Sequence, residues 1–135
     1  MRRPYNEVAR IAAEAWNTML SIEGINVVGS WGVSEKYVLE YRGMPSLALK
    51  VDATQFTGIV IVSLNEDVDH YEIRLAKISP LLLSDKCPIH VAITGVFFEN
   101  LGRTIDELIE RPKGMSDEEY KQIAFAHTEK KWAEQ

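Results

Sequence analysis

The chain has 135 residues, a formal net charge of −5 and a pI near 5.2. This length predicts one globular domain over residues 1–135, and the hydrophobic fraction of 46% is ordinary for a soluble protein. The acidic balance argues against nucleic acid as the main partner, because phosphate binding needs clustered Lys and Arg. The single cysteine excludes an internal disulfide, and the sequence shows neither a secretory signal nor an apolar run long enough to cross a bilayer. We therefore expect a cytoplasmic protein without membrane association.

The first predicted element is an amphipathic helix over residues 4–22. Its apolar residues recur at helical spacing, and the polar residues fall on the opposite side. Pro4 suits the first turn of a helix, and Gly24 suits the position just after its end. The apolar stripe consists of Val8, Ile11, Ala12, Ala15, Trp16, Met19 and Leu20.

The middle of the chain predicts β-strands. A short strand is expected at 25–28, followed by a bend at 29–32 that carries a packed Trp31. Apolar and polar residues then alternate with a period of two, which predicts a sheet with one apolar face and one wet face. Arg42-Gly43 is expected to form a tight turn, and the acidic segment 65–69 a solvated one. The later strands are expected at 37–41, 47–52, 59–62, 70–76 and 89–94.

The residues after the last strand predict two helices. The first ends before Pro112, and it begins either near Val96 or at Thr104, which forms a capping-box pattern with Glu107. Its apolar residues at helical spacing are Phe97, Phe98, Leu101, Ile105, Leu108 and Ile109. The second helix is expected to begin at Ser116.

The last predicted helix spreads large apolar residues around its circumference, so they cannot all face one core. We therefore expect residues 113–135 to protrude from the domain or to pack against another protein chain. That chain is either a different protein or a second copy in a two-fold homodimer. The alternative is a tail whose aromatic residues pack back on the sheet. The proposed interaction residues are Tyr120, Ile123, Phe125 and Trp132.

Three polar residues of one predicted strand are the first candidates for chemistry. His70, Glu72 and Arg74 alternate with apolar residues and therefore share one face. A histidine and a carboxylate in a cleft support general acid–base catalysis, whereas on a wet sheet face such residues form cross-strand pairs. We favour the second interpretation, because no motif indicates a cleft.

Cys87 and His90 have the spacing of half a zinc site. A structural zinc needs about four nitrogen or sulfur ligands, usually from two such pairs, and the sequence offers no second pair. We therefore assign both residues to structure and expect no metal or other cofactor.

Together these patterns predict an α+β fold, in which an N-terminal helix packs on a mostly antiparallel five- or six-stranded sheet and two C-terminal helices follow. In size, acidity and order of elements the chain is similar to small dimeric chaperones of bacterial secretion systems and to helix-plus-meander cystatin-like domains. The uninterrupted run of strands departs from the order in those chaperones. The expected function is a non-enzymatic protein-interaction or accessory module of chaperone or adaptor type. The alternative is a small enzyme or small-ligand binder that uses the polar sheet face around His70, Glu72 and Arg74.

Overall fold

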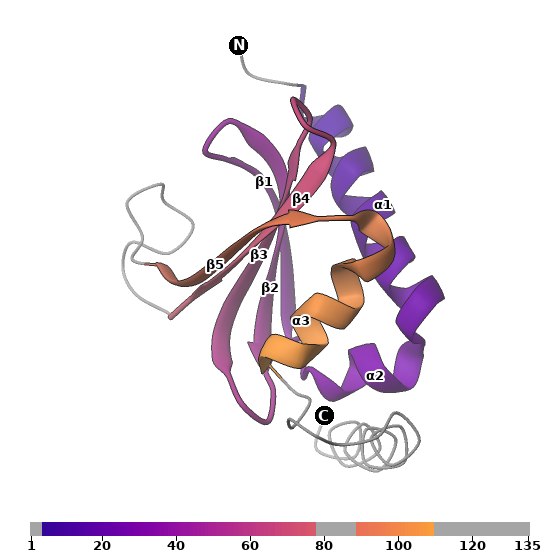
Figure 1. Ribbon diagram of the computed structural model, residues 1–135, viewed down its shortest axis with the longest axis vertical. Helices are drawn as coiled ribbons and strands as arrows, with labels where there is room; N and C mark the ends of the chain where they lie inside the picture. Colours follow the sequence, from indigo (N-terminus) through magenta and orange to yellow (C-terminus); the bar gives the residue numbers. More distant parts are fainter. Residues whose placement is uncertain (1–3, 78–88, 110–135) are drawn as a thin grey trace.

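A computed structural model describes residues 4–77 and 89–109. Two helices precede a sheet, and a short 3-10 turn and a third helix follow it (Figure 1), which confirms the predicted α+β fold. The predicted helix from Ser116 lies outside the described residues, as do Tyr120, Ile123, Phe125 and Trp132. The elements are α1 (Tyr5–Glu23), α2 (Ile25–Ser30), β1 (Glu35–Tyr41), β2 (Met44–Asp52), β3 (Thr57–Asn65), β4 (His70–Ala76), β5 (Ile89–Val96), η1 (Phe98–Asn100) and α3 (Leu101–Ile109).

The helix α1 forms where the sequence predicts it and buries the predicted stripe. Gly24 ends it with a φ of 87°, and the backbone N–H of Gly24 donates to the carbonyl of Leu20 at 3.0 Å. A positive φ is unfavourable for residues with a Cβ, so glycine fits this position. Trp16 and Leu20 lie at the margin of the core and are partly buried. The fully buried residues of the stripe are Val8, Ile11, Ala12, Ala15 and Met19.

The expected strand at 25–28 is wrong, because these residues form the short helix α2. Val27 and Val28 are both buried, and Trp31, which follows the helix, is fully buried as predicted. A short run of β-branched residues does not by itself distinguish a strand from a buried helix. Here the run forms a short helix that contacts both α1 and α3.

The five strands form one antiparallel sheet in the order β1-β2-β3-β4-β5, each beside its neighbour in the chain. The predicted turn at Arg42-Gly43 is confirmed, and both residues have positive φ, 53° and 78°. This conformation matches a type I′ hairpin turn, whose twist suits the flanking strands. The β3–β4 hairpin closes through the acidic segment, where Asp69 also has a positive φ of 55°.

The helices cover one face of the sheet, and the main core lies between them and the strands (Figure 1). The helix α3 starts at Leu101, after η1, and thus at neither of the two predicted residues. Thr104 is not its cap, because its hydroxyl donates to the carbonyl of Asn100 at 2.8 Å from inside the helix. The indole N–H of Trp31 donates to the Asp106 carboxylate at 2.7 Å, and this buried bond joins the end of α2 to α3.

The other face of the sheet is not wet, which corrects the sequence-based expectation. A second apolar cluster lies there, and its four central side chains have no exposed surface. Two serines on the same face, Ser46 and Ser63, are also buried, and their hydroxyls are 2.7 Å apart. The four residues of the cluster are Tyr41, Ala48, Ile59 and Ile61.

Candidate functional site

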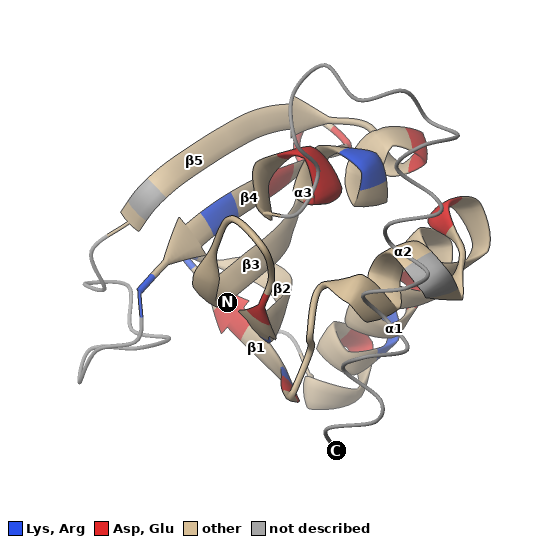
Figure 2. Cartoon of the chain, turned by 90° about the horizontal axis from the view of Figure 1, so that it is seen from below, with Lys and Arg blue, Asp and Glu red and all other residues tan. Residues whose placement is uncertain are grey.

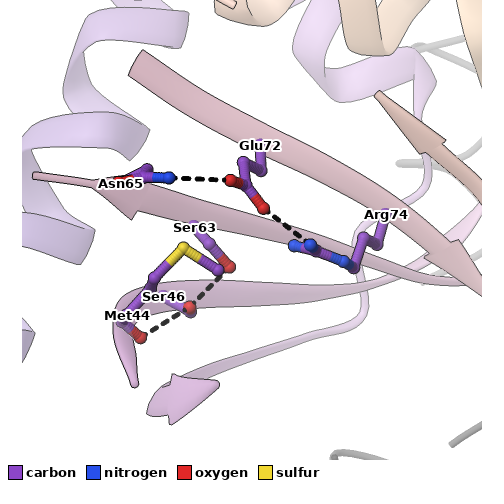
Figure 3. Close-up of polar contacts among 6 residues, drawn as sticks. All are labelled: Met44, Ser46, Ser63, Asn65, Glu72 and Arg74. Carbon is purple, nitrogen blue, oxygen red and sulfur yellow. Dashed lines mark hydrogen bonds and ion pairs between the residues drawn. The ribbon is translucent and has the colours of Figure 1, made fainter. Parts of the chain in front are cut away.

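The polar residues of β4 do not form an open catalytic group. Arg74 donates from Nη2 to Glu72 Oε1 at 2.6 Å, and Asn65 donates from Nδ2 to Glu72 Oε2 at 3.0 Å (Figure 3). The side chains of Arg74 and Glu72 are only 10% and 12% exposed. Both carboxylate oxygens of Glu72 are therefore engaged, and the pair belongs to the covered face of the sheet.

The environment of Glu72 keeps it charged. Burial by itself would raise the pKa of its carboxyl group. The hydrogen bonds from Asn65 and Arg74, together with the charges of Arg74 and Arg42, outweigh burial and lower the pKa below its ordinary value. A general base works best when its pKa lies near the working pH. Glu72 is therefore suited to an ion pair and not to proton abstraction at neutral pH.

Arg74 also packs against an aromatic ring on this face. Its guanidinium carbon lies 5.7 Å from the centroid of the Tyr41 ring, within the range of a cation–π contact. The Tyr41 hydroxyl and Arg74 Nη1 are buried, and neither atom has a hydrogen-bond partner in the part of the chain that the structure describes. Two hydrogen bonds and one ring contact thus fix the Glu72–Arg74 pair in place.

His70 has a different environment from Glu72 and Arg74. It is the first residue of β4, and its ring meets the ring of Phe97 edge-on, with centroids 4.8 Å apart. His70 therefore contacts an aromatic side chain at the end of the sheet where the β3–β4 hairpin turns. The structure separates the three predicted candidates into a buried ion pair and a histidine beside a surface groove.

This groove, named here the Phe98 groove, runs along α1 and is bounded by the β3–β4 hairpin and the η1 turn. It consists of two hollows of about 490 and 460 Å³ that share Glu14, Thr18 and Phe98. The first hollow is also lined by Leu64, Val68, Asp69, His70, Tyr71, Phe97 and Glu99. The second is also lined by Asn17, Ser21 and Ile22.

Large apolar side chains are exposed around the Phe98 groove. Phe97, Phe98 and Val68 are 53%, 56% and 57% exposed, and Ile22 at the far end is 50% exposed. Isolated exposed apolar residues are normal, whereas large contiguous exposed patches are typical of interaction sites. Because three separate elements supply these side chains, the patch is a product of the fold.

The charged residues that line the Phe98 groove are acidic. Glu14, Asp69 and Glu99 lie along it, and no Lys or Arg is among its described lining residues. The pKa of the Tyr71 phenol is raised in this environment. Burial is the larger cause, and the nearby carboxylates of Glu14 and Asp69 add to it. The groove therefore combines exposed apolar side chains with carboxylates, and its charged lining residues are negative.

The sequence does not reveal this groove by itself. Phe97 and Phe98 continue the apolar residues at helical spacing that precede Pro112, yet both are exposed. Neighbouring helical residues point in different directions, so an adjacent pair of phenylalanines was a sign that one core could not bury both. Val68, a single apolar residue within an acidic turn, was the second available sign.

The remaining predicted sites are only partly covered by the structure. Cys87 lies outside the described residues, and His90 lies in β5. Within residues 4–77 and 89–109, no three His, Cys, Asp or Glu side chains gather as a metal site would require. Figure 2 shows that the described Lys and Arg residues are spread over α1, the sheet and α3.

Comparison with known proteins gives no relative, because no family model, curated protein or solved structure matches the chain. None of the described helices is both long enough and apolar enough to span a membrane.

Proposed function

We propose that this chain is a non-enzymatic protein-interaction module that binds a polypeptide segment in the Phe98 groove. The observation that carries this proposal is the gathering of exposed Phe97, Phe98, Val68 and Ile22 around one groove. Aromatic side chains are enriched at protein interfaces, where their burial contributes much of the binding free energy. A partner that covers these four residues would remove a large apolar area from water.

The scaffold beneath the groove supports binding without a large rearrangement. One wall is α1, whose opposite side is anchored in the core by Ala12, Ala15 and Met19. The other wall is the β3–β4 hairpin, which is paired along its whole length from Ile59–Ala76 to Asn65–His70. A preformed surface lowers the entropic cost of binding.

The distribution of polar groups also favours binding over catalysis. The carboxylate of Glu72 is held by Asn65 and Arg74, whereas the ring of His70 contacts Phe97. General acid–base chemistry needs its groups within hydrogen-bond reach of one reacting centre. The groove instead offers exposed apolar side chains beside the carboxylates of Glu14, Asp69 and Glu99.

Selection from a peptide library tests the proposal. Peptides are selected against the unmodified chain and then measured against Phe98→Ser and Tyr5→Ser. Tyr5 is the matched control, because it is a 71% exposed aromatic residue that does not line the groove. We expect selected peptides to lose at least about tenfold in affinity on Phe98→Ser and to keep it on Tyr5→Ser. Equal binding to all three proteins, or no enrichment at all, would contradict the proposal.

A further inference from the structure

The Phe98 groove also indicates the chemistry of its occupant. Building on the proposed function, we infer that the groove binds a cationic amphipathic helix of a partner protein, with apolar residues between Val68, Phe97 and Phe98 and Lys or Arg facing the acidic margin. The inference rests on the sign of the charges around the groove and on its length along α1.

Three carboxylates on three different elements line the first hollow of the groove. Glu14 belongs to α1, Asp69 to the hairpin turn and Glu99 to η1, so each of these elements supplies a negative charge beside Val68, Phe97 and Phe98. Glu14 is joined to Arg10 at 2.8 Å, but both side chains are about 60% exposed. An exposed pair of this kind contributes little free energy, so an incoming cation can replace Arg10 at small cost. An acidic segment would instead meet repulsion from all three walls.

The length of the groove along α1 limits the length of helix that it can contact. Its lining residues on α1 run from Glu14 to Ile22, which at about 1.5 Å per residue spans roughly 12 Å. Apolar residues at positions i, i+3 and i+7 of a partner helix span about 10.5 Å by the same rise. Apolar residues over about two turns of a partner helix therefore match the length of α1 that lines the groove. This is the usual mode in which an amphipathic helix occupies an apolar groove.

The test uses a fluorescently labelled model peptide of about 14 residues, with Leu at i, i+3, i+4 and i+7 and Lys elsewhere. A matched peptide carries Glu in place of every Lys. Fluorescence anisotropy measures both at about 50 mM and 300 mM salt. We expect the Lys peptide to bind with a dissociation constant below about 100 µM, more weakly at high salt, and at least about tenfold more tightly than the Glu peptide.

Charge reversals on the protein locate the contact. Glu99→Lys should weaken binding of the Lys peptide about three- to tenfold. Glu107→Lys makes the same change in net charge on α3, away from the groove lining, and should have little effect. Phe98→Ser should abolish binding while the melting temperature stays unchanged, because Phe98 is already 56% exposed.

The outcomes separate the inference from the proposed function. If both peptides bind equally and both are lost on Phe98→Ser, the groove binds polypeptides but the inferred charge of the partner is wrong. If Glu99→Lys and Glu107→Lys weaken binding to the same extent, attraction to the net charge explains the result and the inference is wrong. Binding that survives Phe98→Ser would overturn both. No binding by either peptide would overturn the inference, whereas the peptide selection decides the proposed function.

Discussion

The buried bond between Trp31 and Asp106 should be one of the strongest polar contributions to stability. The two residues are 75 positions apart, their donor–acceptor distance is 2.7 Å, and their exposures are 0% and 3%. A hydrogen bond contributes about 0.5–1.5 kcal/mol net, and a buried donor that loses its acceptor costs about 1–3 kcal/mol. Because the bond links the end of α2 to α3, its loss should weaken the packing of both on the sheet.

A double-mutant cycle measures this contribution. Trp31→Phe removes the N–H and part of the ring, and we expect it to lower the free energy of unfolding by about 2–4 kcal/mol. Asp106→Ala leaves the indole N–H buried without this acceptor, which should cost about 1–3 kcal/mol or more. The double variant should be less destabilised than the sum of the two, by a coupling of about 1.5–3 kcal/mol. Urea unfolding followed by far-UV circular dichroism is the suitable assay, because Trp31→Phe changes the fluorescence signal.

The helix α3 provides its own control. Arg103 and Glu107 form an ion pair at 3.1 Å, with side chains 61% and 53% exposed. A cycle on this pair should give a coupling of only about 0.3–0.5 kcal/mol. If the Trp31–Asp106 coupling is no larger than that of the exposed pair, the buried bond does not hold α2 and α3 together and the reasoning fails.

Four further predictions concern the core, the ion pair, metal and assembly. Ile11→Ala should cost about 2–5 kcal/mol, since Ile11 is 5% exposed, whereas Glu14→Ala should stay within about 0.5 kcal/mol; equal small losses in urea melts would mean that this side of α1 is not core. The lowered pKa of Glu72 means that its ion pair stabilises the fold above the ordinary glutamate pKa and that this stability is lost as the pH falls through the lowered value. Glu72→Gln should therefore reduce the decline in the free energy of unfolding below about pH 4.3. An unchanged decline in this variant would mean that the Glu72 ion pair does not contribute to acid sensitivity. A strong chelator should leave the melting temperature unchanged, whereas a large drop that zinc reverses would reveal a metal site. The full chain should sediment as a dimer at tens of micromolar and a chain ending at Lys113 as a monomer; two monomers would exclude self-association through residues 113–135.

The sequence predicted the strands well because their physical signal is local. Alternation at 37–41, 47–52 and 70–76 reflects the pleat of a strand, and the strands β1, β2 and β4 occupy those positions. The expected strand at 25–28 was wrong because a run of β-branched residues is equally compatible with a short buried helix, and α2 contacts both the preceding α1 and the distant α3. The sequence pattern therefore identified the strands in which apolar and polar residues alternate within the strand itself.

The candidate site was harder to predict because it is assembled from separate parts of the chain. Phe97 and Phe98 follow β5, Val68 lies in the β3–β4 turn, and Ile22 lies near the end of α1. None of these segments carries a motif, and their contact depends on how the hairpin and η1 sit beside α1. His70 illustrates the same limit, since its spacing from Glu72 predicted a shared chemistry and its real neighbour is Phe97.

Burial of the second sheet face determines where a partner can bind. From the sequence, that face was expected to be exposed to solvent. The alternative function, an enzyme or ligand binder, requires His70, Glu72 and Arg74 to be accessible on it. In the structure Ser46, Ser63 and Arg74 are at most 8% exposed. A covered face offers little surface to a substrate or partner, whereas Phe97, Phe98, Val68 and Ile22 beside the Phe98 groove are 50–57% exposed. The exposed apolar surface that a partner could bury therefore lies beside α1. For this reason we assign the proposed binding function to the groove and not to the sheet.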